Sequence, residues 1–226
     1  MPELRIHFHR DLDEIDARVT QLFALVGEGL AAATDALLAG DRDAARSLMV
    51  KDSIIDGLYR HVEHLAQREF ALQTPMATDL RFLLSVLRIV PELERSGDLV
   101  EHIALRAARG LDPELTPRIR GLVTNMGRVG VEMWRMVADA YAERDAGGAA
   151  AIDAMDDQMD EFHVSLTAEL SSGVLTVPVA IEMALVARFY ERLGDHAVNI
   201  AKRIGYLAIG DAALPAAVPP PPLPES

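Results

Sequence analysis

The sequence predicts an all-α protein made of two pseudo-symmetric three-helix bundles, with six long helices and an internal duplication. Three observations predict this fold class. Apolar residues recur at three- and four-residue spacing through six long segments. Glycine or proline separates consecutive segments. A block three helices long occurs twice, and its short connections favour antiparallel neighbours.

The six predicted helices are separated by residues that commonly end or start helices. They span residues 8 or 11–38, 41–72, 79–109, 113–144, 149–170 and 178–210. The breaks between them fall at Gly40, Thr74-Pro75, Gly110, Gly147-Gly148 and Ser171-Ser172-Gly173. Thr78 or Asp79 is expected to cap the third helix, and Pro91 is expected to kink it. Signals for β-strands are weak throughout.

The duplication divides the chain into three parts. Residues 1–110 are expected to form a first three-helix repeat and residues 111–210 a second. Residues 211–226 include a run of prolines at 219–222 and show no apolar period. This tail is therefore expected to be disordered or to adopt polyproline II.

The composition argues against several classes of protein. A net charge of −13 and a pI near 4.9 argue against a nucleic-acid partner, because no basic tract is present to displace the counterions of a phosphate backbone. The same charge suits cation binding or plain solubility. The absence of cysteine removes disulfides, thiolate chemistry and cysteine-type zinc sites, and it fits a cytoplasmic protein.

No targeting or membrane-spanning segment is expected. Residues 1–16 are charged throughout and lack the apolar stretch of a signal peptide. The longest uncharged run inside the folded part, residues 170–181, is too short to cross a bilayer. We therefore expect a soluble protein that associates with a membrane only through its partners.

A five-residue motif occurs twice, and its context is repeated with it. Glu94-Arg95-Ser96-Gly97-Asp98, the first motif, returns as Glu191-Arg192-Leu193-Gly194-Asp195, the second motif. In each copy the Glu and the Asp are four residues apart, so on a helix they share one face with Cβ atoms roughly 5–6 Å apart.

An apolar line leads into each motif and predicts that this helix face is packed. The line consists of Leu80, Leu84 and Leu87 before the first motif, and of Ile181, Ala184 and Leu185 before the second. Burying an unpaired carboxylate there is costly, so a cation, a metal ion or local water must compensate.

Each half carries a further acidic pair on an earlier helix, and the pair of the first half matches that of the second. If the paired faces meet across a bundle, four carboxylates converge, and like charges that close require a multivalent cation. Oxygen ligands suit magnesium, manganese, calcium or iron, and zinc where an imidazole joins. The predicted metal ligands are Asp52, Asp56, Glu94, Asp98, Asp156, Asp160, Glu191 and Asp195, with His102, Glu101, His163 and Asn199 as additional candidates.

The same residues also allow interpretations without a metal. A Glu and an Asp four residues apart often lie on a solvated helix face, and Arg95 or Arg192 can pair with acids on a neighbouring helix. Gly97 and Gly194 each cost about 1 kcal/mol relative to alanine inside a helix. They are therefore expected to admit a closely packed helix or a ligand.

The duplicated motifs resemble those of the PhoU family, the regulators of bacterial phosphate uptake. The resemblance covers about residues 8–210 and depends on residues 93–98 and 190–201, with support from Pro75, Asp79, Leu80 and Arg81. It implies a pair of three-helix bundles that bind multinuclear clusters of iron, zinc or divalent ions through acidic motifs. Carried onto this chain, those motifs are the eight carboxylates named above. His102 departs from the family, which often has Asn there, so the two sites are expected to differ in metal preference.

The resemblance also implies a role. Such proteins are not enzymes; they are similar to adaptors that link the phosphate-specific ABC transporter to the phosphate-sensing histidine kinase and hold the phosphate-starvation response off when phosphate is plentiful. We therefore expect a cytoplasmic, homodimeric negative regulator with metal ions (iron, zinc, manganese or magnesium) as cofactors. Two alternatives stay open. One is a metal-free helical scaffold whose acids form salt bridges between helices. The other is a ferritin-like di-metal oxidase, which the absence of paired Glu-x-x-His motifs disfavours.

Overall fold

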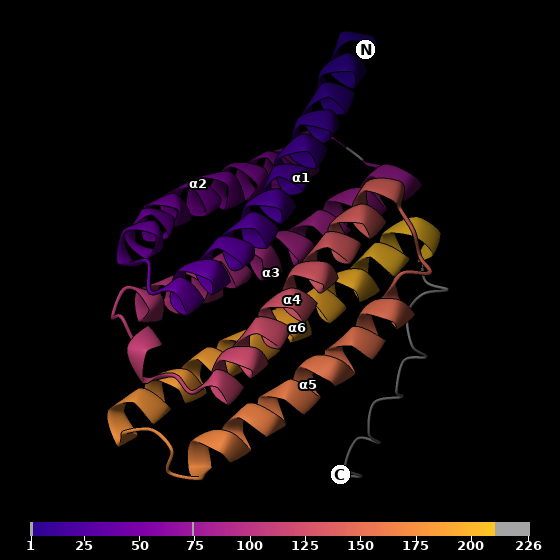
Figure 1. Cartoon of the computed structure of the whole chain (residues 1–226). Coiled ribbons are helices and arrows are strands. Elements are labelled where there is room, and N and C mark those ends of the chain that lie inside the picture. The colour runs from indigo at the N-terminus through magenta and orange to yellow at the C-terminus, as the bar shows by residue number, and fades with distance from the viewer. Residues whose placement is uncertain (1, 74, 211–226) are drawn as a thin grey trace, which may run out of the picture.

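The protein folds as two three-helix bundles that pack against each other (Figure 1). The computed structural model describes residues 2–73 and 75–210, without the side chains of residues 2–4 and 50–52. The helices are α1 (Pro2–Ala39), α2 (Arg42–Leu72), α3 (Ala77–Ala107), α4 (Pro117–Glu143), α5 (Ala149–Ser171) and α6 (Val177–Ile209), with a 3₁₀ turn η1 at Asp112–Glu114. No strand occurs in this described part of the chain, which confirms the all-α fold class. The prediction made for the tail, residues 211–226, falls outside it.

Each helix of a half packs against the other two helices of that half. Across the halves, α1 packs against α4 and α3 packs against α6. The predicted boundary at residue 110 falls in the connection between α3 and η1. The two interfaces join the halves closely. The exact bounds of the two repeats, residues 1–110 and 111–210, therefore stay a prediction.

The predicted start of α3 is wrong. The helix begins at Ala77, whose φ is +42°, and its N-cap residue Met76 makes no side-chain capping hydrogen bond. Thr78 and Asp79 therefore lie inside the first turn and neither is the cap. The helix then continues through Pro91.

The predicted starts of α1 and α4 are also displaced. α1 begins at Pro2, several residues before the predicted start. α4 begins at Pro117 because Thr116 caps it: Thr116 Oγ1 accepts a hydrogen bond of 3.2 Å from the backbone N–H of Ile119. The residues just before this cap form η1 instead of the predicted first turn of the helix.

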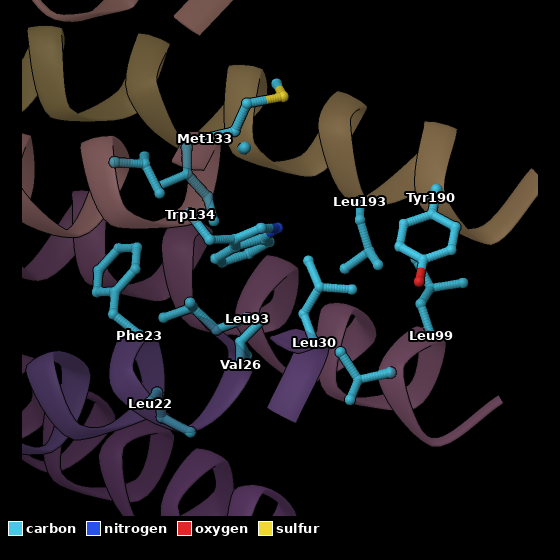
Figure 2. Close-up of a cluster of buried hydrophobic side chains, with 14 of the residues drawn as sticks. Leu22, Phe23, Val26, Leu30, Leu93, Leu99, Met133, Trp134, Tyr190 and Leu193 are labelled. Carbon is cyan, nitrogen blue, oxygen red and sulfur yellow. The ribbon is translucent and has the colours of Figure 1, made fainter. Parts of the chain in front are cut away.

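Buried apolar side chains from all six helices form one continuous core. Trp134 of α4 is 1% exposed, and its ring centroid lies 6.4 Å from that of Phe23 in α1. Figure 2 shows this contact together with Leu93 and Leu193, which come from the two sequence repeats. The two halves therefore share a hydrophobic core, and their relative position is set by its packing.

Among the described helices, α1 is long and apolar enough to cross a membrane by length and composition, over Arg5–Ala39. This test does not contradict the prediction that no helix spans a membrane, which stays a prediction. In the folded chain Ile15, Val19 and Leu22 of this helix are fully buried against other helices. A core helix passes the same test, so the high hydropathy of α1 follows from its place in the bundle.

Candidate functional site

The two motifs meet where α3 packs against α6, an interface that we call the α3–α6 seam (Figure 1). Along the seam, residue numbers rise on one helix as they fall on the other. His102 stacks on Phe189 with ring centroids 5.3 Å apart, and Ser96 contacts His196. The helices are therefore antiparallel, and the first motif lies opposite the second.

A buried hydrogen bond joins the two motifs across the seam. Ser96 is fully buried and His196 is 4% exposed, and Ser96 Oγ lies 2.9 Å from His196 Nδ1. The Ser96 hydroxyl donates to the carbonyl oxygen of Glu92 at 2.7 Å, so its lone pairs are available to accept a hydrogen bond from His196 Nδ1–H. Burial lowers the pKa of His196, and the Glu92 carboxylate opposes this effect from 3.7 Å.

Sequence reasoning missed this bond. In the sequence, His196 is one residue of the repeated stretch 190–201, and Ser96 is the position at which the first motif differs from Leu193 of the second. The bond joins residues 100 positions apart, so it depends on the register of α3 against α6. The available signal was a histidine at a position that the apolar period of α6 assigns to the buried face.

In the second half, four predicted ligands influence one another. Burial raises the pKa of Asp156 to about 6, with further contributions from Asp160, Asp195, Asp153 and Glu191 in that order. Each of these acids raises the pKa because an additional negative charge nearby disfavours ionisation. The predicted mutual repulsion of carboxylates from α5 and α6 is therefore present in the structure.

Glu191 shows the same effect. Burial raises its pKa, followed by the charge of Asp195, while Arg188 on its own helix opposes the rise. One carboxylate oxygen, Oε2, is buried and has no hydrogen-bond partner among the described residues. An orphaned buried oxygen of this kind is costly unless a further group binds it.

Gly194 makes room for Asp156. A Cβ atom built on Gly194 would overlap the Oδ1 atom of Asp156, so α5 can place this carboxylate against the α6 backbone only because residue 194 is glycine. Gly97, its equivalent in the first half, has Ile55 as its neighbour, with Cδ1 2.9 Å from the hypothetical Cβ. The expected close approach is present at both glycines, and an acid makes it in the second half.

In the first half, fewer of the predicted acidic ligands are shown to influence one another. Burial raises the pKa of Asp98, Asp56 on α2 raises it further, and His102 opposes the rise. Asp56 also pairs with Arg60 on its own helix at 3.6 Å. The side chain of Asp52 is outside the described residues, so its predicted place in this cluster is not described.

The apolar line that leads into the second motif is not packed as predicted. Ile181 is 57% exposed and Leu185 is 37% exposed, and Ala184 is exposed as well. Asp195 and Asp160 are also exposed. Helical periodicity identified residues that share a face, but the part of that face before the second motif is largely exposed to solvent.

The additional ligand candidates are dispersed. His102 is exposed and stacks on Phe189, Asn199 is exposed, and His163 is half-buried near Glu191. Glu101 instead lines a small cavity between α1, α2 and α3. None of these side chains completes a ligand set in the structure.

The acidic residues offer the oxygen ligands that metal ions bind, but in the structure they are not arranged as a complete metal site. Within residues 2–73 and 75–210, excluding the undescribed side chains, no group of three or more His, Asp or Glu side chains is placed to hold an ion. The recess at Gly194, the orphaned Glu191 Oε2 and the raised pKa values favour an added cation.

Salt bridges do not replace that cation. Arg95 pairs with Glu92 on its own helix at 2.8 Å, and not with an acid on another helix. Among the described residues, no ion pair links Asp98, Asp156 or Asp195 to a neighbouring helix. The interhelical salt bridges required by the scaffold alternative are therefore not found at these acids.

The fold and the site define an internally duplicated helical protein with paired carboxylate motifs at a central seam. A family model described as "PhoU domain" matches residues 19–107 and 123–204. The chain belongs to the PhoU family.

Similar proteins agree over almost the full length. The chain is 34% identical over 214 residues to the phosphate-specific transport system accessory protein PhoU homolog 2 of Mycobacterium tuberculosis, which covers 92% of this chain and 99% of that protein. It is 31% identical to the PhoU homolog of Rhizobium meliloti, over 90% of this chain and 87% of that protein. The crystal structure of PhoU from Pseudomonas aeruginosa superposes with a TM-score of 0.83 at 28% identity, over 90% of this chain and 99% of that one.

Proposed function

We propose that this chain is an accessory protein of a phosphate-transport system and that it restrains phosphate uptake by binding other proteins, not by catalysis. The observation that carries this proposal is the match of 92% of the chain to relatives named phosphate-specific transport system accessory proteins. The partners proposed are the phosphate ABC transporter and the phosphate-sensing histidine kinase. We further propose a cytoplasmic homodimer that reaches the membrane only through these partners.

The acidic clusters are proposed to hold metal ions. Support comes from the recess that Gly194 leaves for Asp156, and from carboxylates whose pKa values are raised by burial and by one another. An iron, zinc, manganese or magnesium ion would supply positive charge to offset this repulsion. The residues that would hold it are Asp156, Asp160, Glu191 and Asp195 in the second half, and Asp52, Asp56, Glu94 and Asp98 in the first.

Metal binding is proposed to stabilise the surface that partners recognise. The acids of one cluster come from two helices, so neutralising their repulsion favours closer packing of α5 on α6, and of α2 on α3. In the absence of added charge, the same carboxylates weaken these two contacts. The helix faces that carry the acids are partly exposed and can contact a partner directly.

A pull-down from phosphate-replete cells tests this function. Tagged full-length protein is expected to capture the transporter and the kinase, and to lose them when the extract is treated with a chelator. Replacing both Glu94 and Asp98 by alanine is expected to reduce capture as the chelator does. Capture of neither partner would refute the adaptor role, whereas capture that is indifferent to chelator and to the double substitution would refute only the metal dependence.

A further inference from the structure

The two ends of the α3–α6 seam are equivalent by the internal duplication. The first and second motifs align without a gap, so each position on α3 has a counterpart on α6. Because the helices are antiparallel, the counterparts of residues at one end of the seam lie at the other end. The molecule therefore contains two versions of one local arrangement, and they can be compared residue by residue.

At the end where α6 begins, a carboxylate binds two arginines. Arg106 Nε lies 3.3 Å from Glu182 Oε2, and Arg109 donates a hydrogen bond to Glu182 Oε1. The guanidinium of Arg106 also lies over the ring of Phe189, 5.0 Å from its centroid. Glu182 thus forms ion pairs with two cationic side chains, and the hydrogen bond among these contacts comes from Arg109.

At the other end the acid is missing. The counterpart of Arg106 is Arg203, the counterpart of Arg109 is Tyr206, and the counterpart of Glu182 is Ser85. Ser85 is 1% exposed, and its hydroxyl has no hydrogen-bond partner among the described residues. Among the described residues Arg203 forms no ion pair either, because the position that corresponds to Glu182 is a serine and not an acid.

A pocket occupies this end of the seam. It has a volume of about 100 Å³ and is lined by Leu84 and Arg88 of α3 and by Arg203 and Tyr206 of α6. Arg88, like Arg203, forms no ion pair with any described residue. Two unpaired guanidinium groups thus share one pocket in a chain where 35 acidic residues outnumber 22 basic ones.

The chemistry of this arginine pocket is that of an anion site. Arg88 is exposed and Arg203 is half-buried, and two cationic side chains that line one pocket without an ion pair to a described residue favour a negative group between them. Guanidinium groups present planar pairs of donors that match carboxylate and phosphate oxygens, and the Tyr206 hydroxyl adds another donor. The volume is sufficient for a few water molecules or for one small oxyanion.

We propose that the arginine pocket binds a small oxyanion, namely a phosphate, sulfate or carboxylate group, in the role that the Glu182 carboxylate has at the other end of the seam. Arg88 and Arg203 supply the charge, one from each helix, and Tyr206 donates a hydrogen bond. Because the ligand bridges α3 and α6, its binding tightens the seam between the two halves. The proposal is independent of the metal clusters.

Binding of inorganic phosphate, sulfate and acetate to the full chain tests the proposal. Protein freed of metal and then of chelator is titrated with each anion by calorimetry at constant ionic strength. We expect one site per chain for at least one anion, and about ten- to hundred-fold weaker binding in Arg203→Gln, because a charge-assisted hydrogen bond is lost. Preference for phosphate or sulfate over acetate identifies a tetrahedral ligand group, and the reverse identifies a carboxylate.

Arg192→Gln is the matched control. Arg192 is an exposed arginine on the same helix and outside the pocket, so its loss changes the net charge equally and should leave the affinity within about twofold. The proposal is overturned if none of the three anions binds at millimolar concentration. It is also overturned if Arg203→Gln and Arg192→Gln weaken binding to the same extent.

A second pair of variants uses the duplication itself. Ser85→Glu supplies the carboxylate that the other end already has, and we expect it to abolish anion binding without removing a cation. Glu182→Ser frees Arg106 and Arg109 and should raise the stoichiometry from one site to two. Unchanged anion binding in a folded Ser85→Glu protein would contradict the proposal; if that variant does not fold, the Arg203 and Arg192 comparison decides.

Discussion

Replacing Asp156 by asparagine should stabilise the metal-free protein at neutral pH. The Asp156 carboxyl lies in the recess at Gly194 near four other acids, and its pKa is raised from 3.8 to about 6. A rise of this size corresponds to at most about 3 kcal/mol of unfavourable free energy when the group is ionised. Because the carboxyl is only partly buried, solvent screening reduces this to about 1–2 kcal/mol.

The pH dependence of this effect has a definite sign. The folded-state pKa of Asp156 is above the unfolded-state value, so the unfolded chain releases its proton first as the pH rises. The stability of the wild type relative to Asp156→Asn therefore falls between about pH 4 and pH 6 and is constant above that. At pH 4 the two proteins should be nearly equal in stability.

Urea unfolding and thermal melts at pH 4, 5, 6 and 7.5, on protein freed of metal, measure the difference. At pH 7.5 we expect Asp156→Asn to melt about 2–8 °C above the wild type. Asp157→Asn is the control, because Asp157 is the exposed next residue of α5 and its substitution changes the net charge equally. Equal melting temperatures for the two variants at pH 7.5, or an advantage that persists undiminished at pH 4, would show that the ionised Asp156 carboxylate does not destabilise the fold.

Three further changes test the packing around the site. Gly194→Ala should raise the free energy of unfolding of the metal-free protein by about 0.5–1 kcal/mol in urea, as Gly121→Ala on an open face of α4 should, because its methyl group only displaces the end of the Asp156 side chain from an unfavourable position; a loss of more than about 1 kcal/mol would show that the carboxylate is held in the recess. Thr34→Val should cost about 1–3 kcal/mol by the same assay, since it removes the 2.6 Å partner of the buried Tyr190 hydroxyl; no loss would mean that this bond is not made. Ser96→Ala should cost about 1–3 kcal/mol in thermal melts by leaving His196 without its partner, and a loss no greater than that of Ser47→Ala on exposed α2 would contradict the seam bond.

The helices were predictable because their signals are local. The bounds of α2 and α6 agree with the apolar period and its glycine and proline breaks to within a residue or so. The first residues of α3 and α4 could not be predicted, because several residues that can cap a helix lie close together in the sequence there. Thr116 is used as a cap whereas Thr78 is not, and the local sequence does not distinguish the two.

The site was predictable only in part. The spacing within each motif identified Glu191 and Asp195 as one helix face, and the duplication pointed to Asp156 on the facing helix. The burial of that face was not predictable, because periodicity does not say which side of a helix a neighbour covers, as exposed Ile181 shows. The Ser96–His196 bond depends on the antiparallel register of α3 and α6, which no local pattern encodes.

The most direct test of the account is the metal content of the wild type and of Asp156→Asn after equilibrium dialysis against manganese, zinc or ferrous ions. Elemental analysis of the wild type should find bound ions at a fixed ratio to protein, and Asp157→Asn should retain that ratio. Asp156→Asn should lose the ions of the second half, because it removes a carboxylate oxygen from the recess at Gly194. A wild type that retains no ion, or an Asp156→Asn protein that retains the full complement, would contradict the claim that these carboxylates are gathered to hold a metal.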